Sequence, residues 1–429
     1  MATRVSLVAK GKLRGKVRVP PSKSYTHRAV LMASLARGKS KVSNPLISRD
    51  TLATIQACRA MGARIEEDGP SLRIVGSEPS APDDVVNAEN SGTTLRFMTS
   101  AFSLAQSGYI VLTGDASTRR RPMQGLLDAL SGLGANAKSS KGDGFAPIII
   151  GEGGMGGGDT EVRGDVSSQF VSSILIASPL ARGDSSLRVF DAVSRPYIDA
   201  TLRLSELHGI EVDREGYSKF KVRGRQEYRP CDFSVPGDFS SASFLMAAVA
   251  LVGGTIELLG LTTSLPQGDS TMLDILDRMG VEVERRQGSV LVRADGGELN
   301  GGRFDLSDTP DLLPVLSVLA LKSGDPVEIT GVAHARFKET DRIRVTAEGL
   351  TMIGAHVKER PDGLRISKPD RFAKAVLDAH DDHRMFMAFS LASLLAPRRV
   401  GVVGAESLDV SYPSFLDDMN KLGVRVAKA

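Results

Sequence analysis

The stretch Ile275-Leu276-Asp277-Arg278-Met279-Gly280-Val281-Glu282-Val283-Glu284 holds the pattern that decides the fold. A helix-like segment leads up to Gly280, a residue type that suits the left-handed position following a helix. After the glycine, apolar and polar residues alternate with period two, as in a half-buried strand. The stretch therefore predicts a helix, a tight turn and a strand.

The same pattern occurs six times along the chain. The glycines of the six copies are Gly62, Gly134, Gly209, Gly280, Gly354 and Gly423. Successive glycines are 72, 75, 71, 74 and 69 residues apart. Such regular spacing predicts six copies of one structural unit.

A second helix is expected before each of these helices. Its six starts are rich in Ser, Thr and Asp and lie at residues 22–24, 90–93, 165–168, 238–241, 308–311 and 381–384. The segments behind them, such as residues 244–252 and 312–321, are apolar on several faces, which is typical of buried helices. Each unit should thus contain strand, buried helix, strand, outer helix and strand. Ser, Thr and Asp cap helices, and the same N-termini can also bind anions.

Six units predict an α/β protein of two similar domains, each with three repeats around buried helices. The proline-containing breaks at residues 19–21 and 235–237 occupy related positions, three units apart. We expect one domain at 20–236 with units one to three, and another from 1–19 plus 237–429 with units four to six. Two crossings near 19–21 and 235–237 would form a hinge that closes on a ligand.

Composition narrows the class of function. The chain has 429 residues, 41% of them hydrophobic and 24% charged, with a net charge of +3. These values are ordinary for a globular protein and give no strong field for nucleic acid. Cys58 and Cys231 form no metal or redox spacing, which favours a reducing compartment. No signal peptide or membrane span is evident, so we expect a cytoplasmic protein with no membrane partner.

Residues 336–344, Arg-Phe-Lys-Glu-Thr-Asp-Arg-Ile-Arg, gather charge at one expected helix start. Thr340 is the expected N-cap. Lys338 and Arg342 are alike in charge and oppose the helix dipole, a conflict that a bound anion would resolve. Glu339 places a carboxyl group beside a lysine, so proton transfer is feasible. The alternative is a solvated helix end with a Glu339–Arg342 ion pair.

Further charged residues lie at the other helix starts. They are Lys23, Arg28, Arg96, Asp311, His383 and Arg384, together with the basic turn Arg119-Arg120-Arg121. Their recurrence at equivalent positions favours a small substrate with several negative charges. The turn alone would also fit a solvated loop or a weak nucleic-acid patch, but no aromatic residue interleaves it for base stacking. His380 and His383 are three apart without a third ligand cluster, so we expect no metal and no cofactor.

Several motifs together resemble the 5-enolpyruvylshikimate-3-phosphate (EPSP) synthases over essentially the whole chain. The motifs span residues 21–28, 90–96, 121–122, 167–169, 194–197, 338–342 and 382–384. The resemblance implies the inside-out α/β barrel fold of the enolpyruvyl transferases, with three βαβαββ units in each of two domains. It also implies transfer of the enolpyruvyl group of phosphoenolpyruvate to the 5-hydroxyl of shikimate 3-phosphate, on the shikimate pathway to aromatic amino acids.

The resemblance further implies roles for individual residues. Asp311, Lys338 and Glu339 would be catalytic, with Glu339 protonating the methylene carbon and either Asp311 or Lys338 taking the hydroxyl proton. Shikimate 3-phosphate would contact Lys23, Ser24, Arg28, Ser167, Ser168, Gln169, Ser194, Tyr197, Asp311, His334 and Lys338. Phosphoenolpyruvate would contact Lys23, Gly92, Arg121, Gln169, Arg342, His383 and Arg384. The family also implies a monomer without a cofactor.

Two positions depart from the family pattern. His334 stands where many relatives carry Asn, and Val410 stands where many carry a phosphoenolpyruvate-binding lysine. Either Arg342 and Arg384 suffice, or a neighbour such as Lys421 replaces the missing cation. We expect weaker phosphoenolpyruvate binding than in relatives with the lysine.

Two other functions would be alternatives to the one that the resemblance implies. UDP-N-acetylglucosamine enolpyruvyl transferases share the fold, but typically carry Lys-Asn where this chain has Lys23-Ser24. They also carry a cysteine in a mobile loop, and the comparable loop at residues 114–119 has none. A non-catalytic RNA- or anion-binding repeat protein would not require Asp311, Lys338 and Glu339 together.

Overall fold

The computed structural model describes residues 3–397 and 399–428. Its contacts divide the chain into two compact units, which are described separately below. Unit 1 comprises residues 1–20 and 236–429, and unit 2 comprises residues 21–235. No helix among the described residues is both long and apolar enough to cross a membrane.

The described residues form six four-stranded sheets that share one strand order. In each sheet two neighbouring strands run parallel and the other two pair antiparallel. The second strand of the parallel pair also pairs antiparallel with its other neighbour. The repeat is therefore βαβαββ, and the expected fold class is confirmed.

Unit 2 holds three of the sheets. Their strands, in spatial order, are β14 (Phe233–Ser234), β3 (Lys39–Ser43), β5 (Ser71–Val75) and β4 (Arg64–Asp68); β6 (Val86–Asn87), β7 (Ile110–Thr113), β9 (Ile148–Ile150) and β8 (Ala137–Ser139); and β10 (Gly158–Arg163), β11 (Ser185–Phe190), β13 (Lys219–Val222) and β12 (Asp213–Glu215). The first sheet is completed from a distance, because β14 lies at the end of the unit and pairs with β3 near its start.

Unit 1 holds the other three sheets. Their strands are β2 (Leu13–Arg18), β15 (Gly254–Leu259), β17 (Ser289–Ala294) and β16 (Glu282–Arg286); β18 (Gly302–Asp305), β19 (Val327–Thr330), β21 (Gly363–Ser367) and β20 (His356–Arg360); and β22 (Ala375–Asp378), β23 (Val400–Val403), β1 (Val5–Ala9) and β24 (Val424–Lys428). The N-terminal strands β1 and β2 each complete a sheet made otherwise of C-terminal residues.

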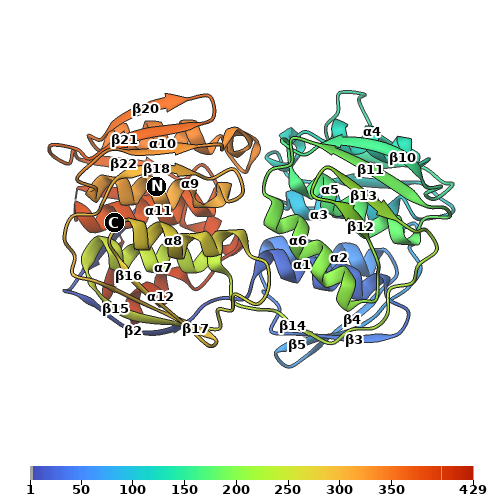
Figure 1. The fold of residues 1–429 in the computed structure, drawn as a ribbon, viewed down its shortest axis with the longest axis horizontal. Helices are drawn as coiled ribbons and strands as arrows, with labels where there is room; N and C mark the ends of the chain where they lie inside the picture. Colours follow the sequence, from blue (N-terminus) through green and yellow to red (C-terminus); the bar gives the residue numbers. More distant parts are fainter. Residues whose placement is uncertain (1–2, 398, 429) are drawn as a thin grey trace. The chain divides into compact units, whose positions relative to one another are not determined.

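Each repeat contributes one inner helix. These helices are α1 (Lys23–Leu35), α3 (Gly92–Phe102), α5 (Ser168–Ala177), α7 (Phe239–Val252), α9 (Leu313–Leu319) and α11 (His383–Leu395). Nearly all their residues are buried, as the apolar sequence predicts. In unit 1, α7, α9 and α11 pack on one another inside the sheets (Figure 1).

Five of the inner helices begin where the sequence predicts. Their N-cap side chains, those of Ser22, Ser91, Ser167, Asp238 and Asp382, each accept a backbone N–H of the first turn. The start of α9 differs, because a 3₁₀ turn, Pro310–Leu312, precedes the α-helix. Pro314 fits only within the first turn of a helix, which limits how early α9 can begin.

The outer helices are α2 (Arg49–Ala60), α4 (Gln124–Gly132), α6 (Arg195–Leu207), α8 (Met272–Arg278), α10 (Arg342–Met352) and α12 (Phe415–Lys421). The six repeat glycines follow them with φ between 75° and 117°, so the predicted left-handed turns are confirmed. The predicted N-cap Thr340 is wrong. Asp341 caps α10 instead, accepting the backbone N–H of Arg344 at 3.0 Å.

Candidate functional site

Arg342 is the centre of a buried charge cluster in unit 1. Its side chain is 1% exposed. Its guanidinium donates to Asp382 Oδ2, Asp311 Oδ1 and Glu339 Oε2, each at 2.7 Å. Three carboxylates thus surround one cation, and together they outweigh the effect of burial and raise the pKa of Arg342. The expected Glu339–Arg342 ion pair is present, but the solvated helix end that accompanied it is wrong for Arg342.

Asp382 joins this cluster to the start of α11. One of its oxygens accepts the backbone N–H of Arg384 at 2.9 Å, and both oxygens contact the Arg342 guanidinium. The two residues just before it, His380 and Asp381, have φ of 51° and 58°. Non-glycine residues seldom adopt this conformation, and it is often found at functional sites.

Asp311 lies among three cations. Its oxygens are 2.7 Å from Arg342, 3.1 Å from Arg384 and 3.8 Å from Lys338. Burial raises the pKa of Asp311, but the attraction of Arg384, Lys338 and Arg342 is stronger, and the net shift is well below the usual range. The cations therefore favour the charged form of Asp311, and as long as they contact it they also make it a weaker base than an ordinary aspartate.

Asp269, which the sequence analysis missed, belongs to the same electrostatic environment. It is 1% exposed and accepts a hydrogen bond from the Ser240 hydroxyl in the first turn of α7. Burial and the nearby charge of Asp311 raise its pKa to about 6. Its only sequence signal is a carboxyl group one turn before an outer helix.

The other predicted residues of unit 1 lie on neighbouring elements. His334 is buried in a 3₁₀ turn, Ala333–Phe337, and His383 is fully buried at the start of α11. Among the described residues, no group of three or more His, Cys, Asp or Glu side chains could hold a metal ion.

Val410 and Lys421 lie near the C-terminus of the same unit. Val410 is 3% exposed at the end of a 3₁₀ turn, Ala405–Val410, that packs against α11. The Lys421 ammonium contacts Asp418 at 2.7 Å, so its charge is already balanced within α12.

In unit 2, Lys23 is paired with a carboxylate that the sequence analysis missed. Lys23 Nζ lies 2.6 Å from Asp50 Oδ2, in the first turn of α2. Burial alone would raise the pKa of Asp50, but the attraction of Lys23 and His27 has a larger effect. The net pKa lies well below the usual range, which favours the charged form of Asp50. Burial lowers the pKa of His27.

A chain of hydrogen bonds runs from His27, which lies 3.6 Å from Asp50, to the start of α3 beside Gly92. His27 Nδ1 is 2.7 Å from Thr54 Oγ1, which lies 2.6 Å from Thr94 Oγ1. Thr94 donates to the Ser91 hydroxyl that caps α3. A Cβ atom added to Gly92 would lie 2.5 Å from an Arg121 nitrogen, so glycine leaves the room that Arg121 occupies.

Gln169 is held by helix α3 at both ends of its amide. Arg96 donates to Gln169 Oε1 at 2.6 Å, and Gln169 Nε2 donates to Thr93 Oγ1 at 2.8 Å. Arg96 also lies 3.4 Å from the hydroxyl of Ser167, next to Ser168. The structure thus brings the 167–169 motif onto the start of α3.

Arg28 is directed into the interior of unit 2. It donates to the Thr201 hydroxyl at 2.7 Å, and to the backbone carbonyls of Ser24 and Tyr197 at 2.9 Å each. Burial lowers its pKa to about 10. Ser194, just before α6, has a left-handed backbone with φ of 52°. Arg28 therefore ties the starts of α1 and α6 together.

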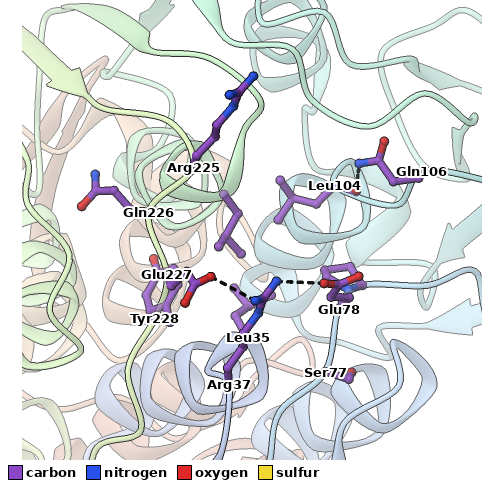
Figure 2. Close-up of a pocket in the computed structure, with 12 residues that line it drawn as sticks. Leu35, Arg37, Ser77, Glu78, Leu104, Gln106, Arg225, Gln226, Glu227 and Tyr228 are labelled. Atoms are coloured by element: carbon purple, nitrogen blue, oxygen red, sulfur yellow. Dashed lines mark hydrogen bonds and ion pairs between the residues drawn. The ribbon is translucent and has the colours of Figure 1, made fainter.

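A separate cavity of about 320 Å³ in unit 2 contains none of the predicted site residues. It lies beyond the C-terminal end of α1, and Figure 2 shows Arg37 held between Glu78 and Glu227 at its edge. Both ion-pair distances are 3.0 Å. Two arginines, Arg37 and Arg225, and two glutamates line this cavity, so it has no net positive charge to attract a multiply charged anion.

Comparison with known proteins gives a consistent family. Residues 8–419 match the family model described as EPSP synthase (3-phosphoshikimate 1-carboxyvinyltransferase). The 3-phosphoshikimate 1-carboxyvinyltransferase of Methanothermobacter thermautotrophicus is 47% identical over 420 residues, which cover 97% of each chain. The enzyme of that name from Nitrosopumilus maritimus is 44% identical, covering 98% of each. A solved EPSP synthase from Acinetobacter baumannii has a TM-score of 0.82 at 28% identity, covering 100% of both chains.

Proposed function

The chain belongs to the EPSP synthase family, and from this premise we propose that it transfers the carboxyvinyl group of phosphoenolpyruvate to shikimate 3-phosphate. A bond forms between the 5-hydroxyl oxygen of shikimate 3-phosphate and C2 of phosphoenolpyruvate. The bond from C2 to the phosphate oxygen breaks, and inorganic phosphate leaves. The product is a precursor for aromatic amino acid synthesis.

The observation that carries this proposal is the Arg342 cluster. Asp311 and Lys338 lie 3.8 Å apart, and one of these two groups would accept the hydroxyl proton. Substrate anions that engage Arg342 and Arg384 would weaken the hold of these cations on Asp311 and so make it a stronger base. Glu339 is the acid that would protonate the methylene carbon and later remove a proton from the resulting methyl group. An anion that engages Arg342 would weaken the Glu339–Arg342 contact, and that loss favours the protonated form of Glu339.

We assign the substrate contacts to the two sets of residues implied by the family resemblance. The shikimate 3-phosphate set is Lys23, Ser24, Arg28, Ser167, Ser168, Gln169, Ser194, Tyr197, Asp311, His334 and Lys338. The phosphoenolpyruvate set is Lys23, Gly92, Arg121, Gln169, Arg342, His383 and Arg384. Both substrates carry several negative charges, which accounts for the cations and helix N-termini.

Arg28 has a second part in this proposal. Its hydrogen bonds to the backbone carbonyls of Ser24 and Tyr197 hold these two members of the shikimate 3-phosphate set in place. The hinge near residues 19–21 and 235–237, the cytoplasmic location and the monomeric state remain predictions.

The rival transferase remains distinguishable by substrate. An enzyme of that kind would release phosphate from phosphoenolpyruvate when UDP-N-acetylglucosamine is added. We expect release with shikimate 3-phosphate and none with UDP-N-acetylglucosamine. Release that requires neither acceptor, or no release at all, would contradict the proposed function.

A further inference from the structure

The side-chain amide of Gln169 is held at both ends by a single helix. Arg96 and Thr93 are three residues apart on α3, so both face the start of α5. Arg96 donates to Gln169 Oε1 at 2.6 Å, and Thr93 Oγ1 accepts from Gln169 Nε2 at 2.8 Å. The amide is therefore fixed in one of its two possible orientations.

Only one of these two partners, Arg96, distinguishes between the two orientations of the Gln169 amide. A guanidinium has donors and no acceptor, whereas a hydroxyl can donate or accept. If the amide were flipped, Thr93 could still form a hydrogen bond by donating to the oxygen. Arg96, however, would then face an NH₂ group and lose a charge-assisted hydrogen bond. Arg96 therefore determines which end of the amide faces it.

Arg96 is itself well fixed. Arg96 is 6% exposed, and its guanidinium carbon lies 5.3 Å from the centre of the Phe170 ring. Phe170 follows Gln169 on α5, so the stacking and the hydrogen bond hold Arg96 against the same turn. This packing limits the other directions that the guanidinium could take.

The orientation matters because the substrates are anions. In the observed orientation, Nε2 has one N–H on Thr93 and a second that remains to donate. In the flipped orientation, an oxygen would occupy that position and repel a carboxylate or phosphate. A hydrogen-bond donor in the site is therefore secured by a residue behind it.

We propose that Arg96 is a positioning residue that fixes the donor orientation of Gln169 toward both anionic substrates. The inference rests on the proposed function, in which Gln169 contacts both substrates. It assigns Arg96 no contact with either of them.

The test compares Arg96→Met with Arg96→Lys in steady-state kinetics. Arg96→Met removes the donor, and we expect KM for both substrates to rise about tenfold, the effect of one hydrogen bond to a charged group, with kcat changed less than about threefold. Arg96→Lys keeps a side chain that can donate but cannot accept a hydrogen bond, so its KM values should lie between those of wild type and Arg96→Met. Thr93→Val should raise KM less than Arg96→Met, because Thr93 does not select the orientation.

A double-mutant cycle separates this role from a general structural one. In a Gln169→Ala background, adding Arg96→Met should change KM less than about twofold, because Arg96 acts through the missing amide. Arg37→Met removes a surface arginine of the same unit and serves as a control with wild-type KM. The inference would be overturned if the KM increases of Arg96→Met and Gln169→Ala multiplied in full in the double variant. It would also be overturned if Thr93→Val raised KM as much as Arg96→Met does. Activity of the wild-type enzyme in the same assay tests the proposed function independently.

Discussion

Replacement of Asp382 is expected to destabilise unit 1 by a predictable amount. Asp382→Ala removes two contacts to buried Arg342, at 2.7 and 3.2 Å, and the cap of α11. Removing one partner of a buried ion pair costs roughly 3–5 kcal/mol. Because Asp311 and Glu339 still contact Arg342, we take about 3 kcal/mol. Loss of the cap adds about 1 kcal/mol, for a total near 4 kcal/mol.

Asp382→Asn separates the two contributions. The amide oxygen can still cap α11, so this variant should lose only about 3 kcal/mol. A change of 1 kcal/mol shifts the melting temperature of a unit of about 200 residues by roughly 2–4 °C. Differential scanning calorimetry of the unliganded protein should therefore show a drop of about 8–16 °C for Asp382→Ala and a smaller drop for Asp382→Asn.

The control is Asp370→Ala in the same unit. Asp370 has a side chain 98% exposed and contacts only exposed His356 at 3.5 Å in the ion pairs described, so its replacement should change stability by less than about 0.5 kcal/mol. If both Asp382 variants shift the melting temperature no more than Asp370→Ala, Asp382 does not stabilise the Arg342 cluster. If Asp382→Ala and Asp382→Asn give equal shifts, the cap of α11 contributes nothing measurable.

Three further predictions follow from the same environment. The raised pKa of Asp269, about 6 against an ordinary 3.8, means that its contribution to stability is full below 3.8 and is lost as pH rises through 6, by ~3 kcal/mol. Asp269→Asn should therefore gain stability relative to wild type between pH 4 and 7 in urea titrations; a constant difference would contradict this. Val410→Lys should lower KM for phosphoenolpyruvate, although it places an ammonium at a buried position and should reduce the melting temperature. An unchanged or higher KM would argue against a missing cation. Lys338→Met should abolish turnover while leaving the circular dichroism spectrum unchanged, and retained turnover would exclude Lys338 from proton transfer.

The repeat was predictable because it is written in local sequence. A glycine follows each outer helix, where the backbone is left-handed, and five of the six inner helices begin at a residue whose side chain caps the helix. The predicted fold class follows from those local signals. Where two capping residues stood together, as at Thr340 and Asp341, the sequence could not decide which would reach the helix N–H groups.

Long-range pairing was not predictable in the same way. Strands β1, β2 and β14 complete sheets whose other strands are far away in sequence, and no local pattern identifies those partners. The same limit applies to Asp50, Asp269 and Arg96. The significance of Asp50 and Asp269 comes from burial and from the partners that the fold brings to them. Lys23, Arg96, Arg342 and Gln169 stood within recognisable motifs, but the hydrogen bond between Arg96 and Gln169 could not be predicted.

Carboxyvinyl transfer can be followed directly by ³¹P NMR of the purified protein with both substrates. We expect the phosphoenolpyruvate signal to disappear as inorganic phosphate appears in equal amount. The signal of shikimate 3-phosphate should lose intensity by the same molar amount, and a new phosphate monoester signal should gain that amount. Glu339→Gln should leave all signals unchanged over the same time. Phosphate release without conversion of shikimate 3-phosphate would exclude carboxyvinyl transfer to this acceptor, and full turnover by Glu339→Gln would exclude Glu339 as the acid.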